Sequence, residues 1–200
     1  MRYYMFNKPK GCITACSDPR HKTVMEYIPP AERQGLFPVG RLDKDTEGLL
    51  ILTDDGAFSN TVSSPSSKKT KTYRLYAEGE YSPEKLNMLE AGVMMKGEGV
   101  SAPSLAKYLG EYRLSDIVSL FPEQRSRILH TKLGNKKIHY VEITVTEGKK
   151  HQIKKMMLAV GMKVVYLERV AISGVLLDAS LERGAYRPLA DEELRSILNQ

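Results

Sequence analysis

The order of hydrophobic and polar residues along the chain predicts a succession of strands and helices. Strict alternation indicates half-buried strands over residues 70–77 and 141–145, because successive side chains of a strand point to opposite faces of a sheet. Short apolar runs bounded by turn residues indicate further strands over residues 3–6, 49–52 and 164–167. Strand patterns therefore occur from one end of the chain to the other.

Apolar residues at helical spacing predict helices between these strands. One helix follows Thr23 and ends at Pro29-Pro30, and a second begins at Ser82-Pro83, where a hydroxyl cap precedes a proline. A third follows Gly148, and a last one begins at Asp191. The positions expected to be buried on the last three helices are Leu86, Leu89, Val93, Ile153, Met156, Met157, Val160, Leu194, Ile197 and Leu198. Strands outnumber helices, so we expect an α+β fold with a mixed, mostly antiparallel sheet and flanking helices.

Length and composition are those of a globular protein. The 200 residues are enough for one domain in two lobes. We place a possible hinge in the serine- and lysine-rich segment 63–69 and the second lobe at roughly residues 70–180. The longest strongly apolar run, residues 49–52, is too short to cross a bilayer, and the N-terminus has no apolar signal region. Cys12 and Cys16 are expected to be reduced thiols. A cytoplasmic protein without a membrane association follows.

The basic residues are unevenly distributed. The formal net charge of the chain is +6, and residues 121–155 alone contain nine Lys or Arg against three Glu, which is also +6. A segment that carries all of the excess charge is typical of a surface that binds phosphates, although a solvated face is an equally good explanation of charge alone. The nine basic residues are Arg125, Arg127, Lys132, Lys136, Lys137, Lys149, Lys150, Lys154 and Lys155.

The most unusual segment is an acidic loop at residues 40–48, which leads directly into the apolar strand 49–52. A tight loop on a rigid element is a common place for catalytic groups. From residue types alone, three interpretations compete. A hairpin with solvated acids is the simplest and is favoured by composition. An Asp-x-Asp phosphatase would need an apolar strand running straight into Asp43, but Gly40 and Arg41 intervene.

Calcium binding is the third interpretation of this loop. Its carboxylates follow the ligand spacing of an EF-hand. That motif needs a helix on each side, and Pro38 and Gly40 oppose the first helix. The residues at the ligand spacing are Asp43, Asp45, Glu47, Gly48 and Asp54.

The motif itself resembles a known family. Gly-Arg-Leu-Asp-x-x-Thr-x-Gly-Leu-Leu-Ile-Leu-Thr-Asp-Asp-Gly, from Gly40 to Gly56, is similar to the signature of the RsuA/RluB/E/F family of ribosomal RNA pseudouridine synthases. Residues 7–11, 71–73 and 147–156 resemble further motifs of the family in the same order. We expect no N-terminal S4-type RNA-binding domain, which makes the chain similar to the RluE-like members. Residues 110–138 match the family poorly and are an expected insertion.

The resemblance implies an isomerase that converts a uridine of ribosomal RNA to pseudouridine, and the RluE-like organisation favours the 23S large-subunit RNA. It assigns the nucleophile to Asp43, contact with the uracil ring to Tyr73, and a cationic partner of Asp43 to Lys154. The reaction keeps every atom of its substrate, so we expect no cofactor and no metal. The alternatives are a synthase that acts on 16S RNA, and a non-catalytic RNA-binding or ribosome-assembly protein on the same fold.

The expected partner is structured RNA, and we expect the protein to be a monomer. Basic and polar side chains beside the family motifs suit phosphate binding, in part near a helix N-terminus. The predicted RNA-binding residues are Arg41, Lys71, Lys149, Lys150, His151, Gln152 and Lys155.

Overall fold

The computed structural model of the protein describes residues 1–199, and at position 65 it describes the backbone alone. The chain divides into two compact units. Unit 1 comprises residues 1–73, 146–148 and 168–200, and unit 2 comprises residues 74–145 and 149–167. The unit boundary falls inside strands β4 (Lys71–Glu78) and β9 (Lys163–Ile172), which run from one unit into the other. The hinge expected at residues 63–69 stays a prediction.

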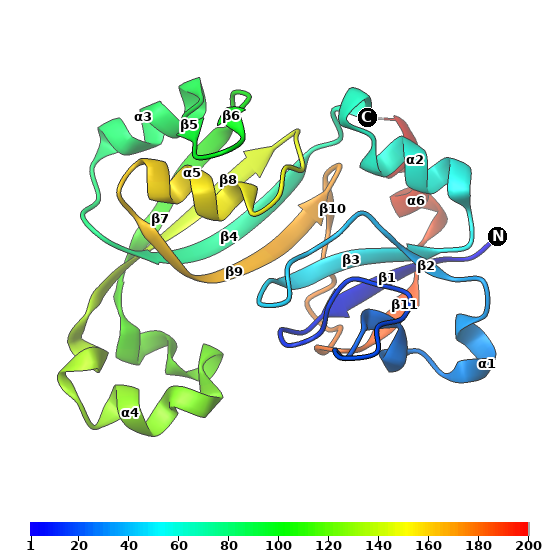
Figure 1. Cartoon of the computed structure of the whole chain (residues 1–200), viewed down its shortest axis with the longest axis horizontal. Coiled ribbons are helices and arrows are strands. Elements are labelled where there is room, and N and C mark those ends of the chain that lie inside the picture. Colours follow the sequence, from blue (N-terminus) through cyan, green and yellow to red (C-terminus); the bar gives the residue numbers. More distant parts are fainter. Residues whose placement is uncertain (200) are drawn as a thin grey trace. The chain divides into compact units, whose positions relative to one another are not determined.

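Unit 1 contains a mixed sheet in the strand order β11-β1-β3-β9, with β2 also paired to β3 and β10 to β9 (Figure 1). Strand β3 pairs antiparallel with β1 and β2 and parallel with β9. All seven residues of β3 are buried, because β3 lies between neighbours and under helices. The strands other than β9 are β1 (Tyr3–Lys8), β2 (Phe37–Val39), β3 (Glu47–Thr53), β10 (Val175–Leu176) and β11 (Tyr186–Pro188).

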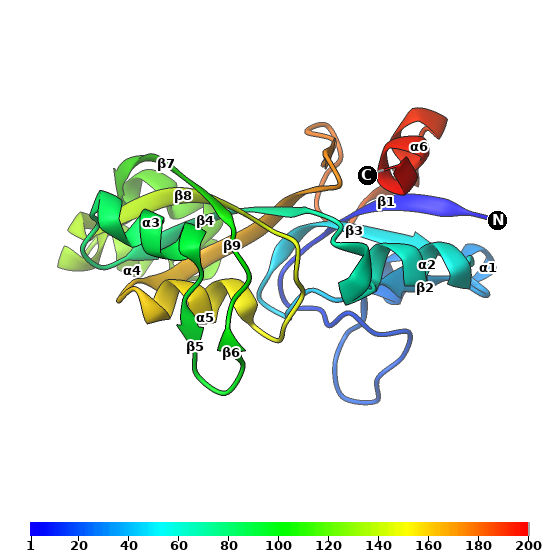
Figure 2. The same cartoon turned by 90° about the horizontal axis from the view of Figure 1, so that it is seen from above.

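The helices of unit 1 are η1 (Val24–Tyr27), α1 (Pro30–Arg33), α2 (Gly56–Ser63), η2 (Pro65–Ser67) and α6 (Asp191–Asn199). Helix α2 packs beside β2 (Figure 2) and was not predicted, because only Phe58 and Val62 mark its buried face. Asp55 begins it by accepting hydrogen bonds from two backbone amides of its first turn. Helix α6 buries Ile197 as expected, but Leu198 is 44% exposed, so that prediction was wrong.

Unit 2 contains the strand order β9-β4-β8-β7, where β7 (Leu105–Arg113) and β8 (Lys137–Val145) form a long antiparallel hairpin. Helices α3 (Pro83–Ala91) and α5 (Gln152–Ala159) and the short hairpin β5 (Met94–Met95) and β6 (Gly99–Val100) pack together around this sheet (Figure 1). The expected face of α5 is buried through Ile153, Met156 and Met157, whereas Val160 lies one residue beyond its last turn.

Residues 114–136, which we name the β7–β8 insertion, connect the two strands of the long hairpin. It consists of short helices: η3 (Leu114–Leu120), η4 (Pro122–Gln124), α4 (Arg125–Leu129) and η5 (Lys132–Asn135). Leu114, Ile117 and Ile128 pack with Ile138 of β8 in a small core of their own. The poor match of residues 110–138 to the family motifs therefore corresponds to a folded structural element.

The predicted α+β class is confirmed, with a mixed and mostly antiparallel sheet flanked by helices. Among the described residues 1–199, no helix has both the length and the apolar character required to span a bilayer.

Candidate active site

The acidic loop between β2 and β3 is fixed at both ends by glycines in the left-handed region of backbone space, Gly40 (φ 69°) and Gly48 (φ 100°). Inside the loop, the amide of Thr46 donates to the carbonyl of Asp43 over 3.1 Å. A Cβ at Gly48 would collide with the backbone carbonyl of Arg169, because β3 and β9 meet here through Glu47 and Gly48. Glycine is thus required where the loop joins the sheet.

The segment after β1 holds the other side of the loop. The hydroxyl of Thr14 donates to the carbonyl of Leu42 over 2.8 Å and accepts from the amide of Leu42 over 3.1 Å. The amide of Gly11 donates to the carbonyl of Lys44 over 2.7 Å. Asp43 is half-buried between these two anchored residues, so its carboxylate is carried by a backbone with little freedom to move.

Lys8 provides the most buried anchor of the loop. Its side chain, the last of β1, has no exposed surface, and Nζ donates to the carbonyls of Thr46 at 2.9 Å and Pro9 at 3.0 Å. The carbonyl of Lys44 lies 3.5 Å from the same Nζ. One ammonium group therefore connects the end of β1 with two residues of the acidic loop.

The same ammonium is a positive charge beside the acidic groups. Burial lowers the pKa of Lys8, while the electrostatic influence of Cys12, Glu47, Asp45 and Asp43 acts in the opposite direction. Sequence reasoning recognised the Asn7–Gly11 turn as a family motif but gave Lys8 no role. The available signal was a lysine that ends an apolar strand directly before Pro-Lys-Gly, where a solvated side chain would also fit.

An ion pair between a buried glutamate and an exposed arginine fixes the residue at the start of β3. Glu47 is 5% exposed, and its Oε2 accepts from Arg183 Nε at 2.9 Å and contacts Nη2 at 2.6 Å. Arg183 Nη2 also lies 3.6 Å from a carboxylate oxygen of Glu168 on β9. A two-point arginine contact has strong directional preference. The pair therefore ties the segment before β11 to the acidic loop.

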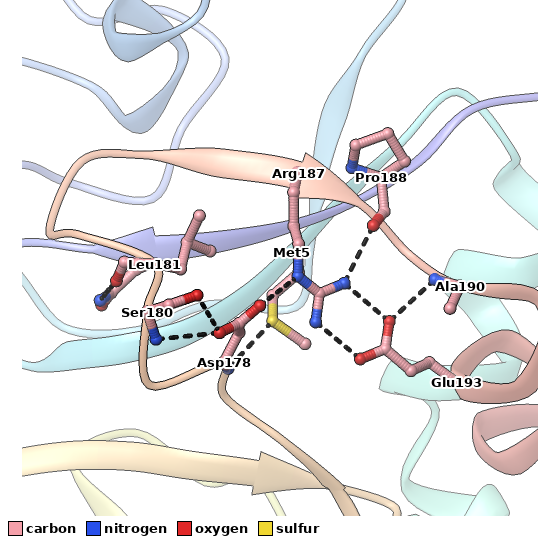
Figure 3. Close-up of polar contacts among 9 residues, drawn as sticks. Met5, Asp178, Ser180, Leu181, Arg187, Pro188, Ala190 and Glu193 are labelled. Atoms are coloured by element: carbon pink, nitrogen blue, oxygen red, sulfur yellow. Dashed lines mark hydrogen bonds and ion pairs between the residues drawn. The ribbon is translucent and has the colours of Figure 1, made fainter.

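A second ion-pair network positions that C-terminal segment (Figure 3). Arg187 donates through Nε to Asp178 at 2.7 Å and through Nη1 and Nη2 to the two carboxylate oxygens of Glu193, each at 2.8 Å. Hydrogen bonds from Ser180 and from Arg187 lower the pKa of Asp178 to about 2. Arg187 thus joins β11 to the loop after β10 and to α6, which keeps the Arg183 segment in place.

Strand β4 carries two of the predicted site residues on one face. Tyr73 is 9% exposed and lies on the same face of β4 as the buried Leu75, as the alternating pattern predicted. Lys71 Nζ donates to the carbonyl of Lys69 over 3.0 Å, and burial followed by the charge of Arg169 lowers the pKa of Lys71. Arg169 is 3% exposed and its Nε donates to the carbonyl of Leu49 over 2.8 Å. Sequence reasoning missed this second buried cation.

The predicted residues of α5 and the turn before it belong to unit 2. His151 takes a left-handed conformation (φ 55°), and Gln152 is buried and accepts from the Lys149 amide over 3.0 Å. Lys149 Nζ donates to the carbonyl of Val100 over 3.1 Å. Lys155 Nζ pairs with Glu98 at 2.8 Å. Both lysines are thus engaged by the β5–β6 hairpin, whereas Lys150 is exposed.

The predicted site residues are thus divided between the two units. Asp43 interacts electrostatically with Lys8, and Tyr73 and Lys71 belong to the same unit. Arg41 is exposed on the acidic loop. Lys154 lies half-buried on α5 in the other unit. Its pairing with Asp43 stays a prediction.

The calcium-binding interpretation of the loop does not fit the fold. The loop lies between strands β2 and β3, so the flanking helices of an EF-hand are absent from this part of the described chain. Two of the proposed ligands already bind arginine: Glu47 pairs with Arg183, and Asp54 pairs with Arg2 Nε at 2.8 Å. Across residues 1–199, no group of three or more His, Cys, Asp or Glu side chains is placed to hold a metal.

Comparison with known proteins identifies the family. A family model described as RNA pseudouridylate synthase matches residues 2–159. The uncharacterized RNA pseudouridine synthase YtzG of Bacillus subtilis is 40% identical over 199 residues, which cover 99% of this chain and 73% of that protein. The chain belongs to the RNA pseudouridylate synthase family. The resemblance read from residues 40–56 is therefore confirmed, and the protein is an RNA pseudouridine synthase.

Other members of the family extend the similarity. Ribosomal small subunit pseudouridine synthase A of Escherichia coli is 34% identical over 197 residues, covering 98% of this chain and 74% of that protein. A crystal structure of a pseudouridylate synthase matches with a TM-score of 0.78 at 30% identity, covering 98% of this chain and 73% of that one. Human RNA pseudouridylate synthase domain containing 1 has a TM-score of 0.60 at 12% identity, which shows a shared fold alone.

Proposed function

We propose that this synthase isomerises a uridine of ribosomal RNA and that Asp43 is its nucleophile. The observation that carries the proposal is the fixed position of Asp43, on a loop anchored by two glycines, Thr14 and the buried ammonium of Lys8. Among the acids of this loop, Glu47 already binds Arg183 and Asp45 is exposed. Asp43 is half-buried and lies within the family motif.

The chemistry needs few groups. The N1–C1′ bond breaks, the uracil turns while it stays bound, and a C5–C1′ bond forms; the proton lost from C5 balances the one gained at N1. A carboxylate at the reacting carbon can act as the nucleophile. We propose that Tyr73 contacts the uracil ring and that Lys154 is the cationic partner of Asp43. The target nucleotide must leave its stack to reach these groups.

The choice of ribosomal RNA follows from named relatives. A relative 34% identical to this chain is named a small subunit synthase, so small-subunit RNA is the first substrate to test. The 23S target that the RluE-like resemblance implies is the second arm of the same test. We propose that the enzyme acts as a monomer on structured RNA.

The nucleophile is tested with Asp43→Asn, and Asp45→Asn is the matched control in the same loop. Each purified enzyme is incubated with transcripts of 16S and 23S RNA in EDTA, and pseudouridines are mapped by carbodiimide-dependent reverse-transcription stops. We expect Asp43→Asn to lower the rate by at least about a thousandfold, with RNA affinity retained, and Asp45→Asn to stay within about tenfold of wild type. Turnover by Asp43→Asn would refute the assignment. A strict need for a divalent ion on a short unstructured substrate would contradict the metal-free mechanism.

Lys154 is tested by separating rate from affinity. Lys154→Met should lower the single-turnover rate at saturating enzyme by about tenfold or more, because a desolvated carboxylate loses its partner. Lys155→Met, which removes a lysine that pairs with Glu98, is the control and should leave that rate unchanged. If Lys154→Met lowers affinity and not the saturated rate, Lys154 is a phosphate contact only.

A further inference from the structure

The connection between β7 and β8 is far longer than its strands require. Antiparallel neighbours are normally joined by two to five residues, but the β7–β8 insertion occupies residues 114–136. Figure 1 shows it at the end of the hairpin, away from α3 and the β5–β6 hairpin of the same unit. Connections in compact domains are mostly short, and binding residues are often carried by connecting segments on a rigid scaffold.

The insertion has a defined shape. The amide of Leu114 donates to the carbonyl of Lys136 over 2.9 Å, which closes its base. Ile117 and Ile128 are almost fully buried in its core. Gly134 packs so closely on the backbone of Ile128 that a Cβ there would collide with it. The backbone that carries the charged side chains of this surface is therefore packed, although the side chains themselves are exposed.

The cations of segment 121–155 differ in whether they form ion pairs. Lys136 pairs with Glu78 and Lys137 with Glu111, each at 2.9 Å. By contrast, none of the ion pairs recorded within the described part of the chain involves the exposed side chains Arg125, Arg127 and Lys132. Lys149 and Lys155 are also engaged by protein groups. Arg125, Arg127 and Lys132 of the insertion, together with Lys150, are therefore the exposed basic side chains of this segment without a recorded ion pair in the described part of the chain.

We propose that the β7–β8 insertion is an RNA-docking module that binds backbone phosphates through Arg125, Arg127 and Lys132. The inference rests on the proposed function for its substrate, a polyanion whose phosphates match this group of cations. Arginine and lysine side chains both bind phosphate oxygens through their positive charge. The module contributes affinity and choice of substrate, and no group that takes part in the chemical step.

The test is the triple variant Arg125→Gln/Arg127→Gln/Lys132→Gln. Its matched control, Arg20→Gln/Lys107→Gln/Arg195→Gln, removes the same charge from three exposed side chains on other elements. A third variant, Arg125→Lys/Arg127→Lys, keeps the charge. Binding to 16S and 23S transcripts is measured by filter retention across a salt series, single-turnover rates are measured at saturating enzyme, and circular dichroism confirms the fold of each variant.

We expect the triple variant to flatten the slope of log affinity against log salt by about two units and to weaken binding by up to about a hundredfold at 0.1 M salt. The control should change the slope by less than about half a unit, the lysine variant should bind nearly as wild type, and the saturated rate should be the same in all four proteins. A triple variant that binds RNA like the control overturns the inference. Normal binding of naked RNA combined with lost activity on ribosomal particles also overturns it and indicates an acidic protein partner.

This outcome is separate from that of the proposed function. Salt-dependent RNA binding can be measured whether or not a pseudouridine forms, so an inactive wild-type enzyme would refute the proposed substrate and leave the binding comparison intact. Conversely, an active enzyme whose triple variant binds normally would refute the docking module alone.

Discussion

Replacing Lys8 by methionine removes the buried ammonium that connects β1 with the acidic loop. Methionine fills nearly the same volume but cannot donate, so the carbonyls of Thr46 and Pro9, now 2.9 and 3.0 Å from Nζ, lose a buried donor. An unsatisfied buried acceptor costs about 1–3 kcal/mol. Relief from burying a charge offsets part of this loss, as the pKa of Lys8, lowered by burial, indicates. We expect the free energy of unfolding to fall by about 2–4 kcal/mol.

The single-turnover rate of Lys8→Met should fall by more than its loss of stability explains. Lys8 fixes the residues on either side of Asp45, and a displacement of about 1 Å in a catalytic group can reduce a rate about a hundredfold. We expect Lys8→Met to lower the single-turnover rate at least tenfold at a temperature where the variant is fully folded.

The assay compares urea unfolding followed by circular dichroism with single-turnover pseudouridine formation. Lys107→Met, which changes an exposed lysine of β7, is the control and should alter neither quantity. The reasoning is refuted if Lys8→Met unfolds within about 0.5 kcal/mol of the control and turns over at the wild-type rate. If the free energy of unfolding falls but the folded variant turns over at the wild-type rate, only the claim that Lys8 positions the acidic loop is refuted.

Two further predictions concern stability. Gly48→Ala should destabilise the protein by about 2 kcal/mol or more in a urea titration, because it combines a φ of 100° with a collision against the Arg169 carbonyl. The control Gly56→Ala, in open space at the start of α2, should be neutral or stabilising in the same titration. Asp178, with its pKa lowered from 3.8 to about 2, contributes stability above pH 4 that is lost as the pH falls from about 4 to 2. An Arg187→Met variant should lose less over that window, and equal losses in acid titrations of the two proteins would contradict the role of the ion pair.

Residue patterns in the sequence were sufficient to predict several strands and helices and to identify the family. Alternation located β4 and β8, and helical spacing located α3 and α5, because these patterns follow from the geometry of each element and from one buried face. The segment 40–56 identified the family without any structure, because its motif is long, contiguous and specific in residue type and spacing. Helix α2 escaped prediction because its two buried residues are too few to establish a period.

Contacts between distant segments were decided only by the tertiary structure. Lys8, Arg169 and Arg183 look like solvated cations in the sequence, but the fold buries the first two and gives the third a buried carboxylate 136 positions away. The same holds for the basic segment 121–155, which looked uniform. Ion pairs with Glu78, Glu98 and Glu111 engage Lys136, Lys155 and Lys137, and none of the ion pairs recorded in the described part of the chain involves the exposed Arg125, Arg127 and Lys132. A sequence specifies which groups carry charge, but burial and pairing depend on which segments the folded chain brings within hydrogen-bonding distance.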